Sequence, residues 1–133
     1  MPSFGQNLSA QRARRNALID VERNRRIRLG FSFEGKPYDY DEGSQARIAG
    51  ASTAALSARI AGSQPGDLRW RWGDRDFVWI AADNSLTPMD AHKCFDFGEA
   101  ALDHEAAHIF AAKTLKNMDD LPEDWKSDLY WPT

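Results

Sequence analysis

The stretch TPMDAHKCFDFGEAALDHEAAHIFAAKTLKN, residues 87–117, decides the fold. Thr87 suits an N-terminal helix cap, Pro88 suits the first helical position, and Asp90 is an acid three residues after the cap. The pattern therefore predicts one helix from residue 87 to about residue 117, which is long for a chain of 133 residues.

This predicted helix carries apolar side chains on two sides, and such a helix must be covered on both. One stripe comprises Phe95, Leu102, Ala106 and Ile109. The second comprises Phe97, Ala101, Ala111 and Leu115, with His104 and His108 in line. We expect the rest of the domain to cover one stripe and a second subunit to cover the other, so that the chain forms a homo-oligomer. The residues assigned to subunit packing are Phe97, Ala101, His104, His108 and Leu115.

A different cover for the second stripe is the C-terminal segment. It is apolar enough to fold back over the helix, through Leu121, Trp125, Leu129, Tyr130 and Trp131. The residue pattern alone leaves both arrangements open.

The segments before the long helix alternate between strand and helix patterns. Residues 27–33 and 38–40 predict a hairpin with a turn at Gly35-Lys36, and residues 68–72 and 77–80 predict a second, Trp-led hairpin. Between them, residues 45–61 predict a helix rich in small side chains that Ser44 caps. The predicted fold class is α+β: two short β-hairpins packed with an Ala-rich helix and one long helix, preceded by an N-terminal arm and a basic helix.

The N-terminal region is basic and the C-terminal region is acidic. Residues 1–29 carry a charge of +5 and residues 83–133 a charge of −7, within a net charge of −3. Residues 1–8 predict a polar arm, and a helix follows from Ser9 to about residue 26. We expect residues 1–26 to anchor the domain of residues 27–133 to a partner through Phe4, Arg12, Arg14, Arg15 and Leu18. The alternatives are that the two charged regions pair within one subunit, or that both are solvated faces.

Composition excludes several function classes. Apolar residues make up 42% of the chain, but no run of 18 of them exists, so no membrane contact is expected. The net charge of −3 argues against general nucleic-acid binding. The chain has a single cysteine and lacks a Gly-rich phosphate loop, so neither a disulfide framework nor a cofactor is expected.

One motif points to catalysis. His104-Glu105-Ala106-Ala107-His108 reads HEAAH, in which two histidines four residues apart can bind Zn²⁺ while the glutamate acts as a general base. A third ligand is needed, and the chain offers only Asp119, Asp120, Glu123 or Asp124 after the pair. A zinc-dependent hydrolase is therefore the enzymatic alternative, against two histidines on a partly buried helix face.

Four stretches carry a resemblance to a known family: FSFEGKPYDYDEGSQARIAGA, LRWRWGDRDFVWIA, SLTPMD and AHKCFDFGEAALDHEAAH. From about Asn24 to Pro132 the chain resembles a small uncharacterised domain of tail-fibre and other tail-associated proteins of tailed phages and prophages. The resemblance implies a non-catalytic, structural component of the virion tail, made in the bacterial host cytoplasm, with other tail proteins as partners. A tail-fibre assembly chaperone is the alternative within this class.

Overall fold

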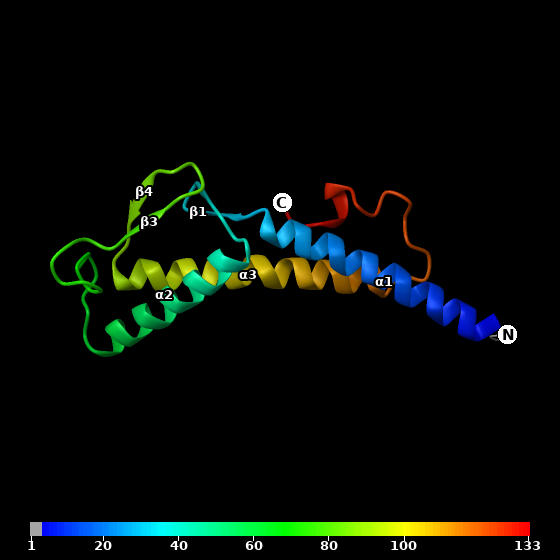
Figure 1. Ribbon diagram of the computed structural model, residues 1–133, viewed down its shortest axis with the longest axis horizontal. Coiled ribbons are helices and arrows are strands. Elements are labelled where there is room, and N and C mark those ends of the chain that lie inside the picture. Colours follow the sequence, from blue (N-terminus) through cyan, green and yellow to red (C-terminus); the bar gives the residue numbers. More distant parts are fainter. Residues whose placement is uncertain (1–3) are drawn as a thin grey trace. The chain divides into compact units, whose positions relative to one another are not determined.

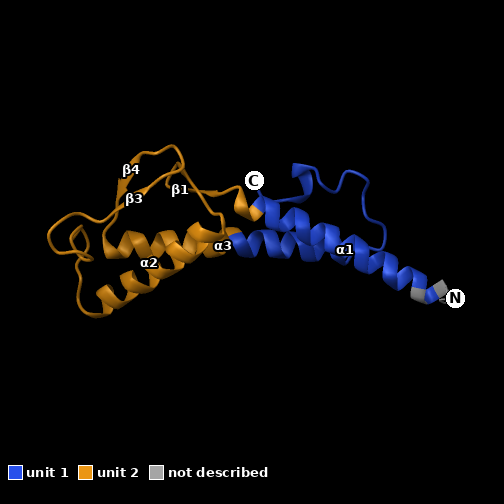
Figure 2. Ribbon diagram, viewed as in Figure 1, with its two compact units in different colours: residues 1–26, 105–133 blue, residues 27–104 orange. Residues whose placement is uncertain are grey.

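The structure is a computed structural model and describes residues 4–133. The chain divides into two compact units (Figure 2). Unit 1 combines the N-terminal segment up to Arg26 with Glu105–Thr133, and unit 2 is Ile27–His104. The predicted division after residue 26 falls at one of the two boundaries, but the other lies within the long helix and places the C-terminal segment with the N-terminal one.

The elements confirm an α+β fold (Figure 1). In chain order they are α1 (Phe4–Arg28), β1 (Phe31–Phe33), β2 (Lys36–Tyr38), α2 (Glu42–Ile60), β3 (Val78–Ile80), β4 (Leu86–Pro88), α3 (Ala91–Lys116) and a 3₁₀ turn, η1 (Asp128–Tyr130). The strands form two separate antiparallel pairs, β1 with β2 and β3 with β4. Among the described residues, no helix has the length and hydropathy that a membrane crossing requires.

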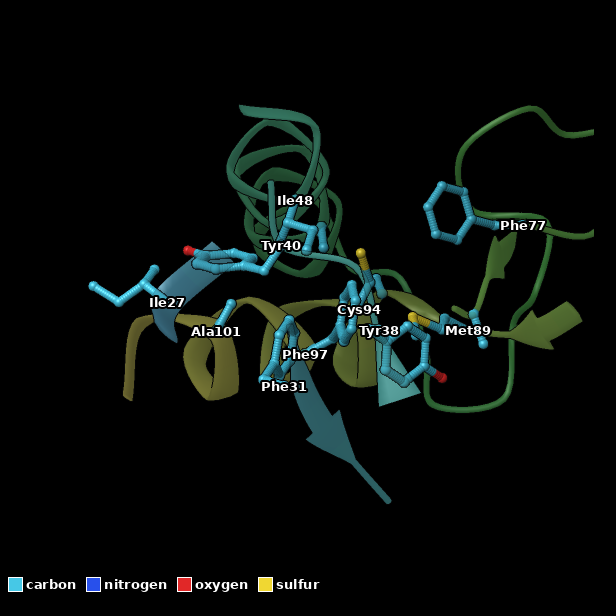
Figure 3. Packing of buried hydrophobic residues seen from close by; sticks show 13 residues of the cluster. Ile27, Phe31, Tyr38, Tyr40, Ile48, Phe77, Met89, Cys94, Phe97 and Ala101 are labelled. Atoms are coloured by element: carbon cyan, nitrogen blue, oxygen red, sulfur yellow. The ribbon is translucent and has the colours of Figure 1, made fainter. Parts of the chain in front are cut away.

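The core of unit 2 forms around Phe97, which is fully buried (Figure 3). Its ring centroid lies 4.7 Å from that of Tyr38 and 5.4 Å from those of Phe31, Phe33 and Trp79. These rings come from α3, from both strands of the first pair and from β3, so one side chain ties three elements of the unit to the helix. Aromatic pairs at such separations add stabilisation beyond the area that they bury.

Helix α2 packs closely against α3 because its inner side chains are small. A Cβ atom at Gly98 of α3 would overlap the side chain of Ser52, so glycine is required where the two helices meet. Helix α2 also begins earlier than predicted. The carboxylate of Asp41 accepts a hydrogen bond from the amide of Ser44 at 3.3 Å, which makes Asp41 the cap and places Ser44 in the first turn.

The first hairpin is confirmed, but its first strand is shorter than predicted and its second strand lies two residues earlier, at Lys36–Tyr38. Phe31 lies opposite Tyr38, and the turn residues Glu34 and Gly35 have φ angles of 49° and 80°. Two successive positive φ angles are what a two-residue hairpin turn demands, so the turn lies one residue before its predicted place. Ile27 and residue 28, predicted as strand, belong to the end of α1.

The prediction for the second hairpin is wrong. Strand β3 pairs with β4, not with residues 68–72, which form turns. The indole of Trp70 donates a hydrogen bond to the carbonyl of Met89 at 2.9 Å. The rings of Trp70 and Trp72 lie 4.8 Å and 5.3 Å from that of Phe77. The alternating tryptophans therefore cover Phe77 from an irregular loop rather than forming a ladder in a sheet.

The predicted start of the long helix is also wrong. Thr87 and Pro88 lie in β4, and α3 begins at Ala91. The carboxylate of Asp90 accepts a hydrogen bond from the amide of Lys93 at 2.7 Å and satisfies a donor of the first helical turn. The capping acid was thus present in the sequence pattern, but three residues later than the cap that we predicted.

Unit 1 consists of α1, the second half of α3 and the C-terminal segment. Its core is formed by Ile19, Ala112, Leu115 and Trp131, and partly buried side chains pack around it, namely Ala111, Met118, Leu121, Trp125 and Tyr130. The arrangement in which the C-terminal segment folds back over α3 is therefore correct, although Leu129 is 77% exposed.

Helix α1 replaces most of the predicted arm. It runs from Phe4 to Arg28, so residues 4–8 are helical instead of extended. The rest of the predicted arm, residues 1–3, lies outside the described residues, as does the side chain of Phe4. Because α1 supplies Ile19 to the core of unit 1, it is part of a folded unit and not a detachable extension.

Candidate functional site

Two of the predicted anchoring residues turn inward, onto the end of α3. The guanidinium of Arg15 donates to the carbonyls of Met118 and Lys116, both at 2.8 Å. Arg12 donates to the carbonyl of Lys116 at 3.1 Å and pairs with Asp119 at 3.3 Å. These carbonyls are among those that a helix C-terminus leaves without an intrahelical donor. Arg12 and Arg15 therefore stabilise unit 1. Their predicted contact with a partner stays a prediction.

Two further residues predicted to contact a partner, Arg14 and Leu18, lie on the solvent side of α1, and Val21, which was not among the predicted residues, is exposed there too. Arg14 is exposed, Leu18 is 58% exposed and Val21 is 65% exposed. These positions recur every three or four residues, so they share one face of the helix. Two further exposed arginines, Arg25 and Arg28, continue this face towards the C-terminal end of the helix. We call the whole set the outer face of α1: Arg14, Leu18, Val21, Arg25 and Arg28. It combines apolar and positively charged side chains.

The basic N-terminal region and the acidic C-terminal region contact each other within unit 1. Arg26 pairs with Asp128 at 2.9 Å, donates to the carbonyl of Lys126 at 2.6 Å and lies 5.3 Å from the ring centroid of Trp131. Asp20, an acid of the N-terminal region, also pairs with Lys116, a base of the C-terminal region, so ion pairs of both polarities join the two regions. The alternative in which the charged regions pair inside one subunit thus holds for these residues.

Glu22 is the buried centre of this charge network. Its side chain is 7% exposed and accepts hydrogen bonds from Arg25 at 2.7 Å and from Arg26 at 2.9 Å. The hydrogen bond from Arg25, acting against the opposing effect of burial and together with that from Arg26, lowers the pKa of Glu22 from 4.5 to about 2. The carboxylate therefore stays charged in the folded protein well below the pH at which it is protonated in the unfolded chain.

The low pKa of Glu22 predicts a specific acid sensitivity. Its contribution to stability is complete above pH 4.5 and is lost as the pH falls towards 2, because only the unfolded chain takes up a proton readily in that range. Glu22→Gln is expected to lower the free energy of unfolding by about 1–2 kcal/mol at neutral pH. Urea unfolding at a series of pH values should show this difference shrinking below pH 4.5.

The matched control for this prediction is Glu123→Gln, since Glu123 is an exposed acid of the C-terminal segment. It is expected to leave stability unchanged across the same pH series. A stability difference for Glu22→Gln that stays constant under acid conditions would contradict the role assigned to its charge.

The residues predicted for a subunit interface are covered by the chain itself. Phe97 is fully buried within unit 2, where Ala101 is 1% exposed. Leu115 at 1% and His108 at 5% exposure are buried within unit 1, and His104 is partly buried. No second copy is needed to shield these side chains, which removes the reason for placing them at an interface.

The opposite stripe of α3 is divided: Phe95 is partly buried against the core of unit 2, whereas Leu102 and Ile109 face outward. Leu102 is 57% exposed, Ile109 47% and Phe110 65%. Between them lies Ala106, and charged exposed residues stand at each end. We call this set the outer face of α3: Glu99, Leu102, Ala106, Ile109, Phe110 and Lys113. The exposed aromatic ring of Phe110 was missed in the sequence, although it follows Ile109 directly and continues the same stripe.

The HEAAH motif has a structural role at its first histidine. The Nε2 atom of His104 lies 2.9 Å from the carbonyl oxygen of Ile27, near the end of α1. Because a carbonyl only accepts, this nitrogen carries the proton and donates. The imidazole also stacks on Phe31, with ring centroids 5.8 Å apart. Within residues 4–133, no three His, Cys, Asp or Glu side chains gather closely enough to hold a metal ion.

His104 is therefore expected to act in stability and not in metal binding. His104→Ala removes the shorter of two hydrogen bonds to the carbonyl of Ile27, which then keeps only the one from the amide of Gly30 at 3.4 Å, and it also loses the ring contact with Phe31. The free energy of unfolding is expected to fall by about 1–2 kcal/mol. His104→Gln, which keeps an N–H donor, is expected to lose less. Elemental analysis of the purified wild-type protein should show no stoichiometric zinc. If the wild type instead held one equivalent of zinc and His104→Ala held none, the result would support a zinc-dependent hydrolase.

A family model described as "Domain of unknown function (DUF4376)" matches residues 10–128. The match covers the basic segment of α1, both strand pairs, α2, α3 and most of the C-terminal segment. No curated protein and no solved structure matches the chain.

Proposed function

Since the chain belongs to this family of unknown function, we propose its role from its surfaces and its residues: it is a non-catalytic structural component of a tailed-phage virion. In this proposal it is a tail or tail-tip and fibre-associated subunit that docks onto other tail proteins through α1 and associates with itself. The likeness of its four sequence stretches to tail-associated phage domains supports the assignment to a virion.

The outer face of α1 is the observation that carries the docking step. It presents Leu18 and Val21 to solvent beside Arg14, Arg25 and Arg28, without an acidic residue among the five. Exposed apolar side chains flanked by charges of one sign suit a partner surface that is apolar at its centre and acidic at its rim. The face repels a copy of itself, so the expected partner is a different protein.

Docking is tested best by point changes on this face. Removing residues 1–20 would delete Ile19 and Arg15, which hold unit 1 together, so a truncation cannot separate docking from folding. Leu18→Glu with Val21→Glu alters exposed positions only and retains residues that favour helices. The matched control is Ile60→Glu, since Ile60 is 80% exposed on α2.

The experiment places each variant in the genome that encodes the chain and measures the protein in purified particles by mass spectrometry. We expect the wild type and Ile60→Glu in the particles, and the double variant folded but absent from them. A wild-type chain that is required for infectious particles yet absent from them indicates the assembly chaperone. A wild-type chain that is neither present nor required overturns the virion role.

A further inference from the structure

The outer face of α3 has an internal symmetry about Ala106. Leu102 and Phe110 stand four residues before and after it, and Glu99 and Lys113 stand seven residues before and after it. At 3.6 residues per turn, all these positions and Ile109 lie within an arc of about 100° on one helix. Since α3 is continuous from Ala91 to Lys116, helical periodicity alone places them on a common face.

The charges at the two ends of this face are available for a partner. The ion pairs that the structure records within residues 4–133 involve neither Glu99 nor Lys113. Both residues are exposed, and between them lie the exposed apolar side chains of Leu102 and Phe110. Along the helix, the face therefore presents an acidic, an apolar, a small, an apolar and a basic side chain in turn: Glu99, Leu102, Ala106, Phe110 and Lys113.

This order fits a second copy of the same face. Consider two antiparallel copies of α3 related by a two-fold axis that passes beside Ala106. A residue that precedes Ala106 by a given number of positions then lies across from the partner's residue that follows Ala106 by the same number of positions. Such a contact repeats every interaction twice, as an isologous interface requires. A foreign partner would have no need for this symmetry in the sequence of α3.

We propose that two copies of the chain associate through the outer face of α3 in an antiparallel helix pair centred on Ala106. Glu99 of each copy lies beside the partner's Lys113, and Leu102 packs next to the partner's Phe110. The methyl group of Ala106 allows the two helix backbones to approach closely. Ile109 extends the apolar contact along one edge of the face, and Asp103 lies at the opposite edge.

The two outer faces thus suit different partners. The outer face of α3 carries one charge of each sign, whereas the outer face of α1 carries three arginines. The inference deepens the self-association step of the proposed function and rests on it. Docking into a particle through α1 is a separate step, which the dimer measurement on purified protein does not involve.

The test uses the full chain and sedimentation equilibrium over a concentration series. We expect a dimer for the wild type, and a monomer for Phe110→Glu over the same range. Ile60→Glu is the matched control and should remain dimeric, because Ile60 is an equally apolar exposed residue on another helix. A monomeric wild type, or an oligomer that survives Phe110→Glu, overturns the proposal.

A charge reversal tests the antiparallel order. Glu99→Lys and Lys113→Glu each place two like-charged pairs in the interface and are expected to raise the dissociation constant by roughly tenfold or more. The double variant exchanges the two charges and restores opposite pairs, so its dissociation constant should return to within a few-fold of the wild-type value. Failure of this rescue overturns the proposed alignment, whatever the outcome of the particle experiment.

Discussion

Phe97→Ala is expected to lower the free energy of unfolding by about 3–5 kcal/mol. The ring is fully buried, and four aromatic side chains surround it at centroid distances of 4.7–5.4 Å. Removing it forfeits these contacts and leaves a cavity that the surrounding strands cannot fill. Because a domain of this size is stable by about 5–15 kcal/mol, the variant is expected near its folding threshold.

The matched control lies on the same helix. Phe110→Ala removes the same ring from a position that is 65% exposed, so its effect on unfolding of the dilute monomer should be within about 0.5 kcal/mol. Chemical denaturation at two protein concentrations completes the comparison. A loss for Phe97→Ala that depends on protein concentration would place Phe97 at a subunit contact after all, because only association makes stability concentration-dependent.

Gly98→Ala is expected to cost about 1–3 kcal/mol, although alanine normally favours a helix over glycine. The added methyl group would lie 2.5 Å from the Cβ atom of Ser52, a distance that forces α2 and α3 apart. Ser52→Gly removes the atoms that collide and should restore much of the lost stability when the two changes are combined. A double variant no more stable than Gly98→Ala would show that another contact limits the approach.

Gly50→Ala provides the comparison for this prediction. Gly50 lies within α2, and no atom lies within 4 Å of a methyl group added there. The same substitution should therefore stabilise the protein by about 0.5–1 kcal/mol. Thermal unfolding of the two alanine variants should move in opposite directions.

Helices and the first hairpin were predictable because local chemistry decides them. The small-residue segment forms α2, and the alternation before Glu34-Gly35 ends in a hairpin turn that positive φ angles allow. The prediction of a strand at residues 68–72 is wrong for a reason that no local pattern reveals. Trp70 donates to Met89, 19 residues away along the chain, and a contact between such distant residues does not show in the pattern of residues 68–72.

The two apolar stripes of α3 also show that a local sequence pattern cannot identify which side chains are buried. Both are apolar at helical spacing, and only contacts with remote elements, such as Tyr38 on Phe97, decide which one is buried. One signal in the sequence could have identified the inner side. Gly98 lies within the long helix next to the Phe97 and Ala101 stripe, and a glycine inside a helix often marks the close approach of another element.

The chain itself covers the side of α3 that carries Phe97 and Ala101, and we propose that the outer face of α3 is left for association. Thiol labelling of Ala101→Cys and Leu102→Cys tests it directly, because these neighbours along the chain are 1% and 57% exposed. Burial raises the pKa of the Cys94 thiol to about 12, so this native cysteine serves as an unreactive internal reference. In dilute native protein, we expect rapid labelling at position 102 and protection at position 101, and the reverse order would show that this assignment of the two sides of α3 is wrong.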